Sequence, residues 1–575
     1  MQEKKQWSNF RGLLLYLVTV FVPFIAVTHK IERPDYLLEV VRIKPVVYDF
    51  LTYYKGMFIV AVAFLMGIVI INDFIKDNEA KAKIIKKTKQ LHNIAAFVLL
   101  FFVLLSFALT EFKEISAFGT YIAGEGTFHW VSYIVIFFYA QIYMSSDLFD
   151  SIGKGLALAF LIIFAVGLLA YMGYSLFEST IFMDLITPGS SRVQVNDAFS
   201  KRFSTFFANP NHAGTYIALL LPLMLTYPFK WMDSKKYLAL NSLIFAMLIF
   251  TKSSAGLLAC SIAIIIAGLY FLFKGSNRIS KKVFGFQLIL FVLIYIGSGG
   301  LIGGGSIEAE LTQLESVAKS SQMKGRLTDI DVSEESVVFS FDQNDFTVKS
   351  SSGQLQFYYN DQILELKQDL DDAAYYTFDN EAIEHFMFRM RDGRTLELLF
   401  GNVQFYIGNM EDGLAVFDTY GRLYEKNSVE RFKPLDGYEG YASGRGYILS
   451  RGLPMLKDTL LVGKGADVFG FLFPHHDFIG KVQLLGKYTH TFDKPHNIYL
   501  FIGYSFGVVA LVSFLVLGII LLIRSINALS LKSNQSISSI CILFAVGMVF
   551  FFNDSMVYST SIIFSILGGL TGMLE

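Results

Sequence analysis

Three short polar segments carry the residue types that can do chemistry, and two of them, 201–216 and 493–507, lead into a long apolar run. The segment 201–216 contains Arg202 and the turn sequence Asn209-Pro210-Asn211, whose second asparagine can cap the helix that follows. A guanidinium beside a helix N-terminus offers hydrogen-bond donors to phosphate oxygens. This segment therefore predicts a phosphate site. The alternative is that Arg202 only contacts lipid headgroups.

The second polar segment, 442–469, contains Arg445 and Arg451 on a predicted amphipathic helix. Each arginine can form paired hydrogen bonds to the oxygens of a pyrophosphate. Two alternatives without a role in chemistry are contact with lipid headgroups and a salt bridge to Asp458.

The third polar segment, 493–507, places His496 directly after Pro495 at the entrance to an apolar run. An ordinary histidine pKa of about 6.5 suits the side chain to accept a proton near neutral pH. Asn497 can orient this loop by hydrogen bonding, and the alternative is an interfacial histidine without a catalytic role. The sequence 475–477, His-His-Asp, superficially resembles a metal cluster, but adjacent histidines in one loop are weak evidence. We expect no metal and no other cofactor.

The elements that must position these residues are transmembrane helices. The chain has 575 residues, of which 53% are hydrophobic and only 17% are charged, whereas soluble proteins carry about 25% charged residues. Its net charge of -1 argues against a nucleic-acid partner. We expect an all-α polytopic membrane protein with 12 spans, each near the length that crosses the bilayer, over 12–28, 57–72, 93–110, 130–145, 156–173, 213–228, 237–251, 255–273, 283–302, 497–523, 537–552 and 557–573.

The orientation of these helices follows from lysine-rich loops at 73–92, 229–236 and 274–282. The positive-inside rule puts these loops in the cytoplasm, and the first span is expected to be retained because no cleavage site follows it. Basic residues in 29–56 oppose this orientation. The long polar stretch 303–496 is then expected outside the cytoplasm, with all three polar segments at the outer ends of spans.

Alternating runs within that stretch predict a small antiparallel β insert at 332–430, with Asp392-Gly393 marking a hairpin. The alternative is a spacer or docking module without chemistry. The predicted organisation is therefore spans one to nine, a helical or linker segment, the β insert, an outer loop with the site motifs, and spans ten to twelve, at 1–302, 303–331, 332–430, 431–496 and 497–575 respectively.

In this order and at these positions, the motifs resemble the O-antigen ligase and Wzy-type polysaccharide polymerase family. The matching features are R-F-x-x-x-F-x-N-P-N from Arg202, S-G-R with a downstream G-x-G around Arg445, and K-P-H-N ending at Asn497. Two features depart from the family pattern. The β insert replaces a mainly helical outer loop, and Lys252 stands near the place where members often carry Ser-Arg.

The resemblance implies a metal-independent glycosyltransferase at the outer face of the cell membrane. It would move a glycan from a polyprenyl-diphosphate carrier to a hydroxyl of a glycan, lipid or wall acceptor. By the same resemblance, Arg202 and Arg445 would stabilise the leaving diphosphate and His496 would be the general base. Contacts to the diphosphate or glycan would come from Arg451, Asn209, Asn211, Lys252 and Asn497.

Two other classes of protein fit the composition. A transporter or exporter commonly has about 12 spans, but it is expected to show repeated halves and interrupted helices, which we do not find in the sequence. A receptor that binds a ligand with its β domain would leave the clustered cations and the histidine unexplained. Ligase and polymerase are not distinguished by the sequence.

Overall fold

The structure is a computed structural model of the chain. It describes residues 2–32, 46–120, 124–187, 203, 205–207, 209–273, 280–299 and 327–574, the last range with gaps at 342–343, 352–353, 369–374, 381–382, 384–385, 392–394, 401–402, 411–412, 418–422, 425–428, 486–490 and 530–533.

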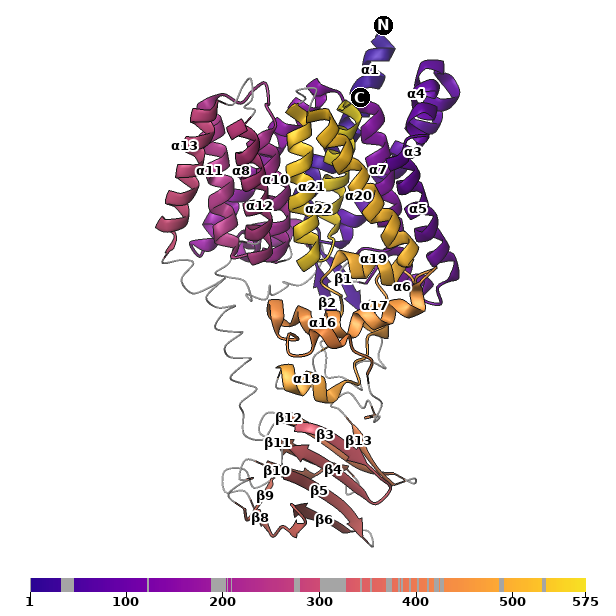
Figure 1. Ribbon diagram of the computed structural model, residues 1–575, viewed down its shortest axis with the longest axis vertical. Coiled ribbons are helices and arrows are strands. Elements are labelled where there is room, and N and C mark those ends of the chain that lie inside the picture. The colour runs from indigo at the N-terminus through magenta and orange to yellow at the C-terminus, as the bar shows by residue number, and fades with distance from the viewer. Residues whose placement is uncertain are drawn as a thin grey trace.

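Helices form the larger part of the molecule (Figure 1). Before the β strands of the insert these are α1 (Gln2–Tyr16, extended by a π turn and a 3-10 turn to Phe24), α3 (Tyr53–Lys76), α4 (Asn78–Thr88), α5 (Leu91–Leu109), α6 (Lys113–Phe118), α7 (Thr127–Tyr143), α8 (Ser146–Tyr171), α9 (Thr180–Ile186), α10 (Pro210–Thr226), α11 (Ser234–Thr251), α12 (Ser254–Phe273) and α13 (Lys281–Gly297). After the strands come α16 (Tyr441–Met455), α17 (Phe469–Leu472), α18 (Phe478–Leu485), α19 (Ile498–Phe506), α20 (Val508–Leu529), α21 (Asn534–Phe552) and α22 (Val557–Met573).

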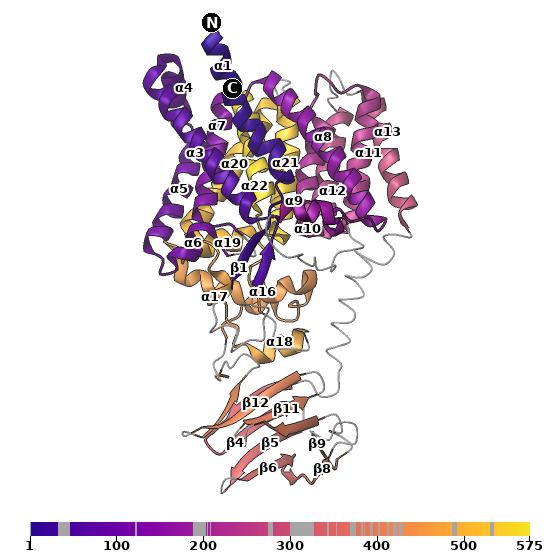
Figure 2. The same cartoon turned by 180° about the vertical axis from the view of Figure 1, so that it is seen from behind.

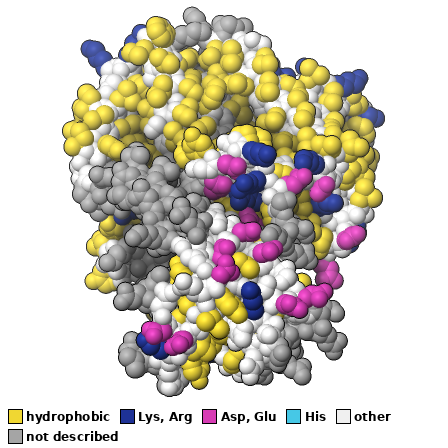
Figure 3. Space-filling view, turned by 60° about the horizontal axis from the view of Figure 1, so that its bottom comes forward, with side chains coloured by type: hydrophobic (Ala, Val, Ile, Leu, Met, Phe, Trp, Pro, Cys, Tyr) yellow, Lys and Arg dark blue, Asp and Glu magenta, His cyan; other side chains and the backbone are white. Residues whose placement is uncertain are grey.

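Within the described residues, seven helical stretches are long and apolar enough to cross a membrane: Gln6–Phe24, α3, α5, α8, α12, α20 and α21. Their outward faces carry exposed large hydrophobic side chains, such as Phe64, Ile265 and Ile519, which a water-soluble surface rarely gathers in quantity. Hydrophobic side chains cover the helical part in Figure 3, and acidic and basic side chains gather toward the end with the strands. The chain is therefore a membrane protein, as its composition predicts.

Every predicted span coincides with a helix, but α7, α10, α11, α13 and α22 are shorter or less apolar than the seven, so the number of crossings stays a prediction. The single helix predicted over 497–523 is wrong, because Gly507 divides it into α19 and α20. Gly507 has a φ of +105°, and a Cβ there would lie 2.6 Å from the carbonyl oxygen of Leu461. Only glycine fits this break without strain.

The β region comprises two antiparallel sheets with a shared apolar core rich in phenylalanine. One sheet has the order β3-β4-β5-β6-β7 and the other β13-β12-β11-β10-β9-β8. The strands are β3 (Leu327–Val332), β4 (Ser336–Phe341), β5 (Asn344–Ser351), β6 (Gln354–Tyr359), β7 (Gln362–Ile363), β8 (Leu366–Gln368), β9 (Tyr376–Phe378), β10 (Phe386–Met390), β11 (Thr395–Phe400), β12 (Val403–Met410) and β13 (Gly413–Phe417).

The strands begin at Leu327, earlier than the predicted start at 332, and β10 pairs with β11 on either side of the predicted hairpin turn. Asp392-Gly393 itself, and residues 303–326 of the predicted helical or linker segment, lie outside the described residues.

One helix of the outer loop joins the β region to the rest of the protein. Phe478, at the start of α18, is buried in the β core against Tyr424, and Gln483 donates a hydrogen bond to the carbonyl of Leu327. The outer helices α16–α18 and the ribbon β1 (His29–Glu32)–β2 (Val46–Asp49) lie between the bundle and the β region (Figure 2). Both termini and α4 lie at the opposite end of the bundle (Figure 1).

Candidate functional site

Arg445 reaches the helical bundle from the first turns of α16. Its Nη1 donates to the carbonyl of Ala442 at 2.9 Å, which holds the guanidinium against the start of its own helix. Its Nη2 lies 3.4 Å from Oδ1 of Asn553, in the loop between α21 and α22. Arg445 is half-buried, so part of its guanidinium surface can meet a ligand.

His496 lies at the same place. Its Nδ1 is 2.6 Å from Oδ2 of Asp554, and its backbone has a φ of +49°. Asn497 fixes this conformation, since its Oδ1 accepts from the amide of Leu500 and caps α19, while its Nδ2 donates to the carbonyl of Phe551. The hydrogen bond to Asp554 occupies Nδ1 and leaves Nε2 as the nitrogen that can exchange a proton with a ligand.

The contact between His496 and Asp554 shifts the pKa values of both groups. Burial disfavours the charged imidazole, but the Asp554 carboxylate outweighs it and raises the pKa of His496 above its ordinary value. Burial likewise disfavours the Asp554 anion, yet His496 and Lys494 lower the pKa of Asp554 to about 2. Asp554 is therefore an anion at neutral pH, and it orients the imidazole while making it more basic.

The loop residues Asn553, Asp554 and Ser555, called the 553–555 loop below, bring separate parts of the chain together. Asn553 Nδ2 donates to Thr215 Oγ1 on α10 at 3.3 Å. Ser555 Oγ donates to Glu125, just before α7. With Arg445 and His496, these contacts converge on three consecutive residues, all of them buried.

Beneath His496 lies a group of buried charges. Lys494 is 8% exposed, and the acids that act on it include Asp554, Asp467 and Glu125, which raise its pKa against the opposing effect of burial. Burial raises the pKa of Glu125 to about 7 and that of Asp467 to about 6. Tyr133 donates to Glu125 at 2.6 Å. The Lys494 ammonium, placed among carboxyl groups, also stabilises the negative charge of Asp554.

The Asn209-Pro210-Asn211 turn lies beside this arrangement. Asn209, not Asn211, caps α10, because the Asn209 Oδ1 accepts from the amide of His212 at 3.1 Å. The capping role predicted for Asn211 is therefore wrong: this residue is exposed within the first turn. His212 Nδ1 lies 2.7 Å from the hydroxyl of Tyr558 on α22, which ties the turn to the segment that follows the 553–555 loop.

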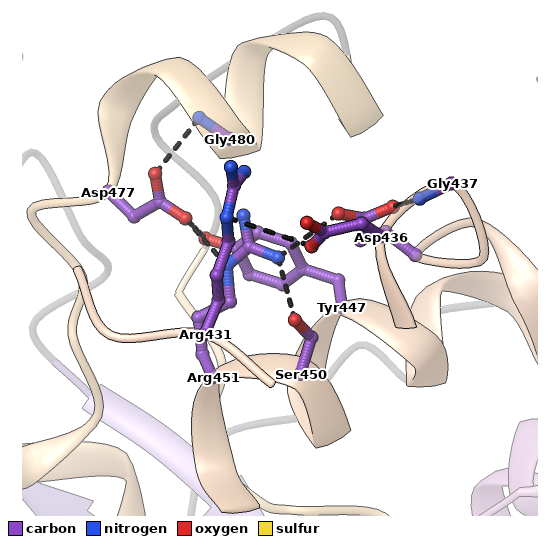
Figure 4. A network of polar contacts seen from close by, with 9 residues as sticks. Arg431, Asp436, Gly437, Tyr447, Ser450, Arg451, Asp477 and Gly480 are labelled. Atoms are coloured by element: carbon purple, nitrogen blue, oxygen red, sulfur yellow. Dashed lines mark hydrogen bonds and ion pairs between the residues drawn. The ribbon is translucent and has the colours of Figure 1, made fainter. Parts of the chain in front are cut away.

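Arg451 belongs to a different cluster, shown in Figure 4. Its Nε donates to Asp477 at 2.9 Å and its Nη1 to Glu439 at 3.4 Å, and its guanidinium lies over the ring of Tyr447. The side chain is 5% exposed. The salt-bridge alternative is thus the observed one, with Asp477 and Glu439 in place of Asp458. The structure does not bring Arg451 to His496.

For two further predicted residues, the structure describes no contact with the site. Arg202 lies outside the described residues. Lys252 ends α11 in the left-handed conformation, with a φ of +54°. Its neighbour Ser253 packs on Gly214 of α10, so the turn lies at the same end of the bundle. No described contact joins Lys252 to Arg445 or His496.

The downstream glycine turn supports the broken helix. Lys464 and Gly465 donate their amides to the carbonyls of Tyr504 and Ser505 at the end of α19, each at 3.0 Å. A Cβ on Gly463 would lie 2.2 Å from the backbone of Ser505. The glycines therefore allow a close backbone contact that satisfies carbonyls left open where α19 ends.

Sequence reasoning missed Asn553, Asp554, Glu125 and Lys494. One signal for the first two was present: a polar Asn-Asp pair between two apolar runs at 537–552 and 557–573.

Among the described residues, no group of three or more His, Cys, Asp or Glu side chains is arranged to hold a metal ion. No protein-family model matches the chain, and a search of curated proteins finds no match. What the protein does must be inferred from its own residues.

Proposed function

We propose that the protein is a membrane glycosyltransferase that transfers or polymerises a glycan from a polyprenyl diphosphate onto an acceptor hydroxyl. The observation that carries this proposal is the His496–Asp554 contact at 2.6 Å, with Arg445 bound to the neighbouring Asn553. It pairs an oriented base with a cation at the end of an apolar bundle. The motif resemblance to O-antigen ligases and polysaccharide polymerases adds the substrate class.

The proposed reaction is a substitution at the anomeric carbon of the donor. The acceptor hydroxyl gives its proton to Nε2 of His496, and its oxygen forms the new bond to the sugar. The bond between the sugar and the diphosphate breaks, and its electron pair leaves with the diphosphate oxygen. Asp554 stabilises the imidazolium that forms. A base of this kind typically contributes about 10²–10⁴-fold in rate.

Arg445 is proposed to stabilise the negative charge that grows on the leaving diphosphate. A planar guanidinium can donate two parallel hydrogen bonds to phosphate oxygens, and fixed donors are effective where charge develops. The half-buried position of Arg445 beside Asn553 supports this role. Arg202 is proposed as a second cation from the resemblance alone.

The site is proposed to face outside the cytoplasm, in a protein with 12 spans. Its end of the bundle carries the β region, whereas both termini and the lysine-rich α4 lie at the other end (Figure 1). Lysine-rich segments are retained in the cytoplasm. The donor lipid lies in the bilayer and the acceptor approaches from water, so the two would meet at this interface.

The experiment uses the lipid-linked glycan that accumulates in cells lacking the protein. Donor binding and turnover are measured on the purified wild type, on His496→Ala and on His476→Ala, a control that removes an exposed histidine from the same outer loop. We expect His496→Ala to lower turnover at least about 10²-fold while donor binding persists. Full turnover in His496→Ala would remove this residue from the mechanism, and loss of both properties would make it structural or donor-binding.

A further inference from the structure

Arg445 and Arg451 lie six residues apart on α16, about 9 Å along the helix axis at 1.5 Å per residue. No residue between them has a positive φ, whereas Ala442, just before Arg445, has a φ of +51°. One guanidinium reaches Asn553 and the other reaches Asp477, in the loop before α18. A regular stretch of helix therefore joins a residue of the candidate site to a second, separate cluster.

The Arg451 end of α16 is held from several sides (Figure 4). The Arg451 guanidinium donates to Asp477 and Glu439 and lies over the ring of Tyr447. The Tyr447 hydroxyl donates to the same oxygen of Asp477 at 2.8 Å, and the amide of Gly480 donates to the other oxygen at 3.0 Å. Asp477 thus accepts hydrogen bonds from both α16 and α18. Arg451, Tyr447 and Asp477 are called the clamp below.

Helix α18 is in turn fixed to the β region. Phe478 follows Asp477 directly and is fully buried in the β core against Tyr424. Gln483 donates to the carbonyl of Leu327 at 2.9 Å. A continuous series of contacts therefore runs from the β core through α18 and the clamp into α16.

The contacts of Arg445 make its guanidinium follow α16. Its Nη1 donates at 2.9 Å to the carbonyl of Ala442, in the same helix. Its Nη2 lies 3.4 Å from Asn553 Oδ1, beyond the usual range for a hydrogen bond. Arg445 is half-buried, whereas Arg451 is 5% exposed. Because the shorter contact is to its own helix, the guanidinium of Arg445 moves with α16.

We propose that Asp477 and Arg451 are positioning residues for the transfer reaction, which fix α16 so that Arg445 lies where the leaving diphosphate needs it; this assignment rests on the proposed function. A guanidinium stabilises developing charge best when its donors are already in place. Displacing a positioned group by about 1 Å can cost about 10²-fold in rate. Arg451, which the motif resemblance places on the diphosphate, thus acts on it only through Arg445.

The test is a double-mutant cycle on turnover per folded molecule, measured on the purified full chain with the lipid-linked glycan that accumulates in cells lacking the protein. Asp477→Asn removes the charge of the clamp and nearly keeps its size. We expect it to lower kcat about tenfold or more, with KM for the donor unchanged, because the diphosphate charge grows in the transition state. In an Arg445→Lys background it should cause no further loss, since residues that act through one another are not additive.

Two further variants accompany the cycle. Arg451→Lys keeps the charge but not the paired hydrogen bonds, and it should give a smaller loss that also disappears in the Arg445→Lys background. It decides the question if Asp477→Asn fails to fold. Asp436→Asn is the matched control, because the ion pair of Asp436 with Arg431 lies in the same outer loop but on neither α16 nor α18; its kcat should equal that of the wild type.

Equal fold losses in both backgrounds would make the clamp a purely structural contact and leave the proposed function standing. Full turnover in Asp477→Asn and Arg451→Lys would also overturn the role of the clamp. Full turnover in Arg445→Lys alone would overturn the proposed role of Arg445, and that of the clamp with it.

If Arg445→Lys leaves no turnover to measure, cross-linking decides. Arg445→Cys and Asn553→Cys are joined by a short bismaleimide, and both natural cysteines are buried. Adding Asp477→Asn should slow this cross-linking, because the start of α16 is no longer held beside the loop. An unchanged rate would show that α16 does not depend on the clamp.

Discussion

Asp554→Asn removes the carboxylate charge next to His496 and keeps a side chain of nearly the same size. The two side chains are in contact at 2.6 Å, but His496 is 40% exposed, so water screens part of the interaction. A hydrogen bond to a charged group contributes about 1.5–3 kcal/mol, and the exposure favours the lower value. Loss of the carboxylate charge should therefore lower the pKa of His496.

The sign of the effect on activity follows from the proposed role of His496 as a base. The imidazole must be neutral to accept a proton, so the rate rises with pH through the pKa of His496, which Asp554 holds above its ordinary value. In Asp554→Asn the rising limb should therefore move to lower pH. The rate on the plateau should fall about tenfold, because the base is weaker and less well oriented.

The assay is the pH dependence of kcat/KM for transfer, which reports the groups of the free enzyme. Asp436→Asn is the control, because Asp436 is an exposed acid of the outer loop whose ion pair with Arg431 lies in the Arg451 cluster. A rising limb that stays in place in Asp554→Asn, with full plateau activity, would refute the assignment of Asp554 as the partner of a catalytic base.

Three further outcomes are expected. Arg445→Lys should lose most turnover with normal folding, whereas Arg451→Met should lower the free energy of unfolding by about 1.5–3 kcal/mol in a denaturation experiment, because it removes the charged hydrogen bonds between a buried guanidinium and the partly buried Asp477 and Glu439; the reverse pattern would exchange their roles. Replacement of 332–430 by a short linker, combined with Phe478→Ser to remove the exposed end of the β core, should preserve measurable transfer, and a folded but inactive product would contradict this. Ser333→Cys should react with a membrane-impermeant thiol reagent added to intact cells, because its position is exposed and both natural cysteines are buried; labelling only after lysis would reverse the orientation.

The parts of the fold that the sequence predicts are those governed by local pattern. Apolar runs of sufficient length locate the helices because hydrocarbon excludes unpaired backbone groups, and alternation around Asp392-Gly393 locates strands β10 and β11. The break at Gly507 was missed, since glycine is also common within membrane helices. What decides the break is the close approach of Leu461, a contact distant in sequence.

In the candidate site, as in the fold, local sequence points to some residues, whereas others depend on contacts that are distant in sequence. His496 could be proposed from its type and its position at the entrance of a predicted span, and Arg445 from its type and its place in the S-G-R segment. Asp554 was not, because its importance comes from a partner 58 residues away. Arg451 could not be separated from Arg445 by sequence for the converse reason: the two resemble each other locally, but the chain folds Asp477 against Arg451 from 26 residues away. Pairing across such separations depends on tertiary packing, which local spacing does not encode.

The 553–555 loop has a consequence for how the protein is made. Arg445, His496, Thr215 and Glu125 all precede it in the chain, yet each makes its contact with this loop. During synthesis, the earlier helices and the outer loop emerge from the ribosome before their common partner exists. The contacts can form only after the 553–555 loop itself has been made. A nascent chain that stalls before Asn553 would carry Arg445 and His496 without the residues that contact them, so on the proposed function it would lack a complete site.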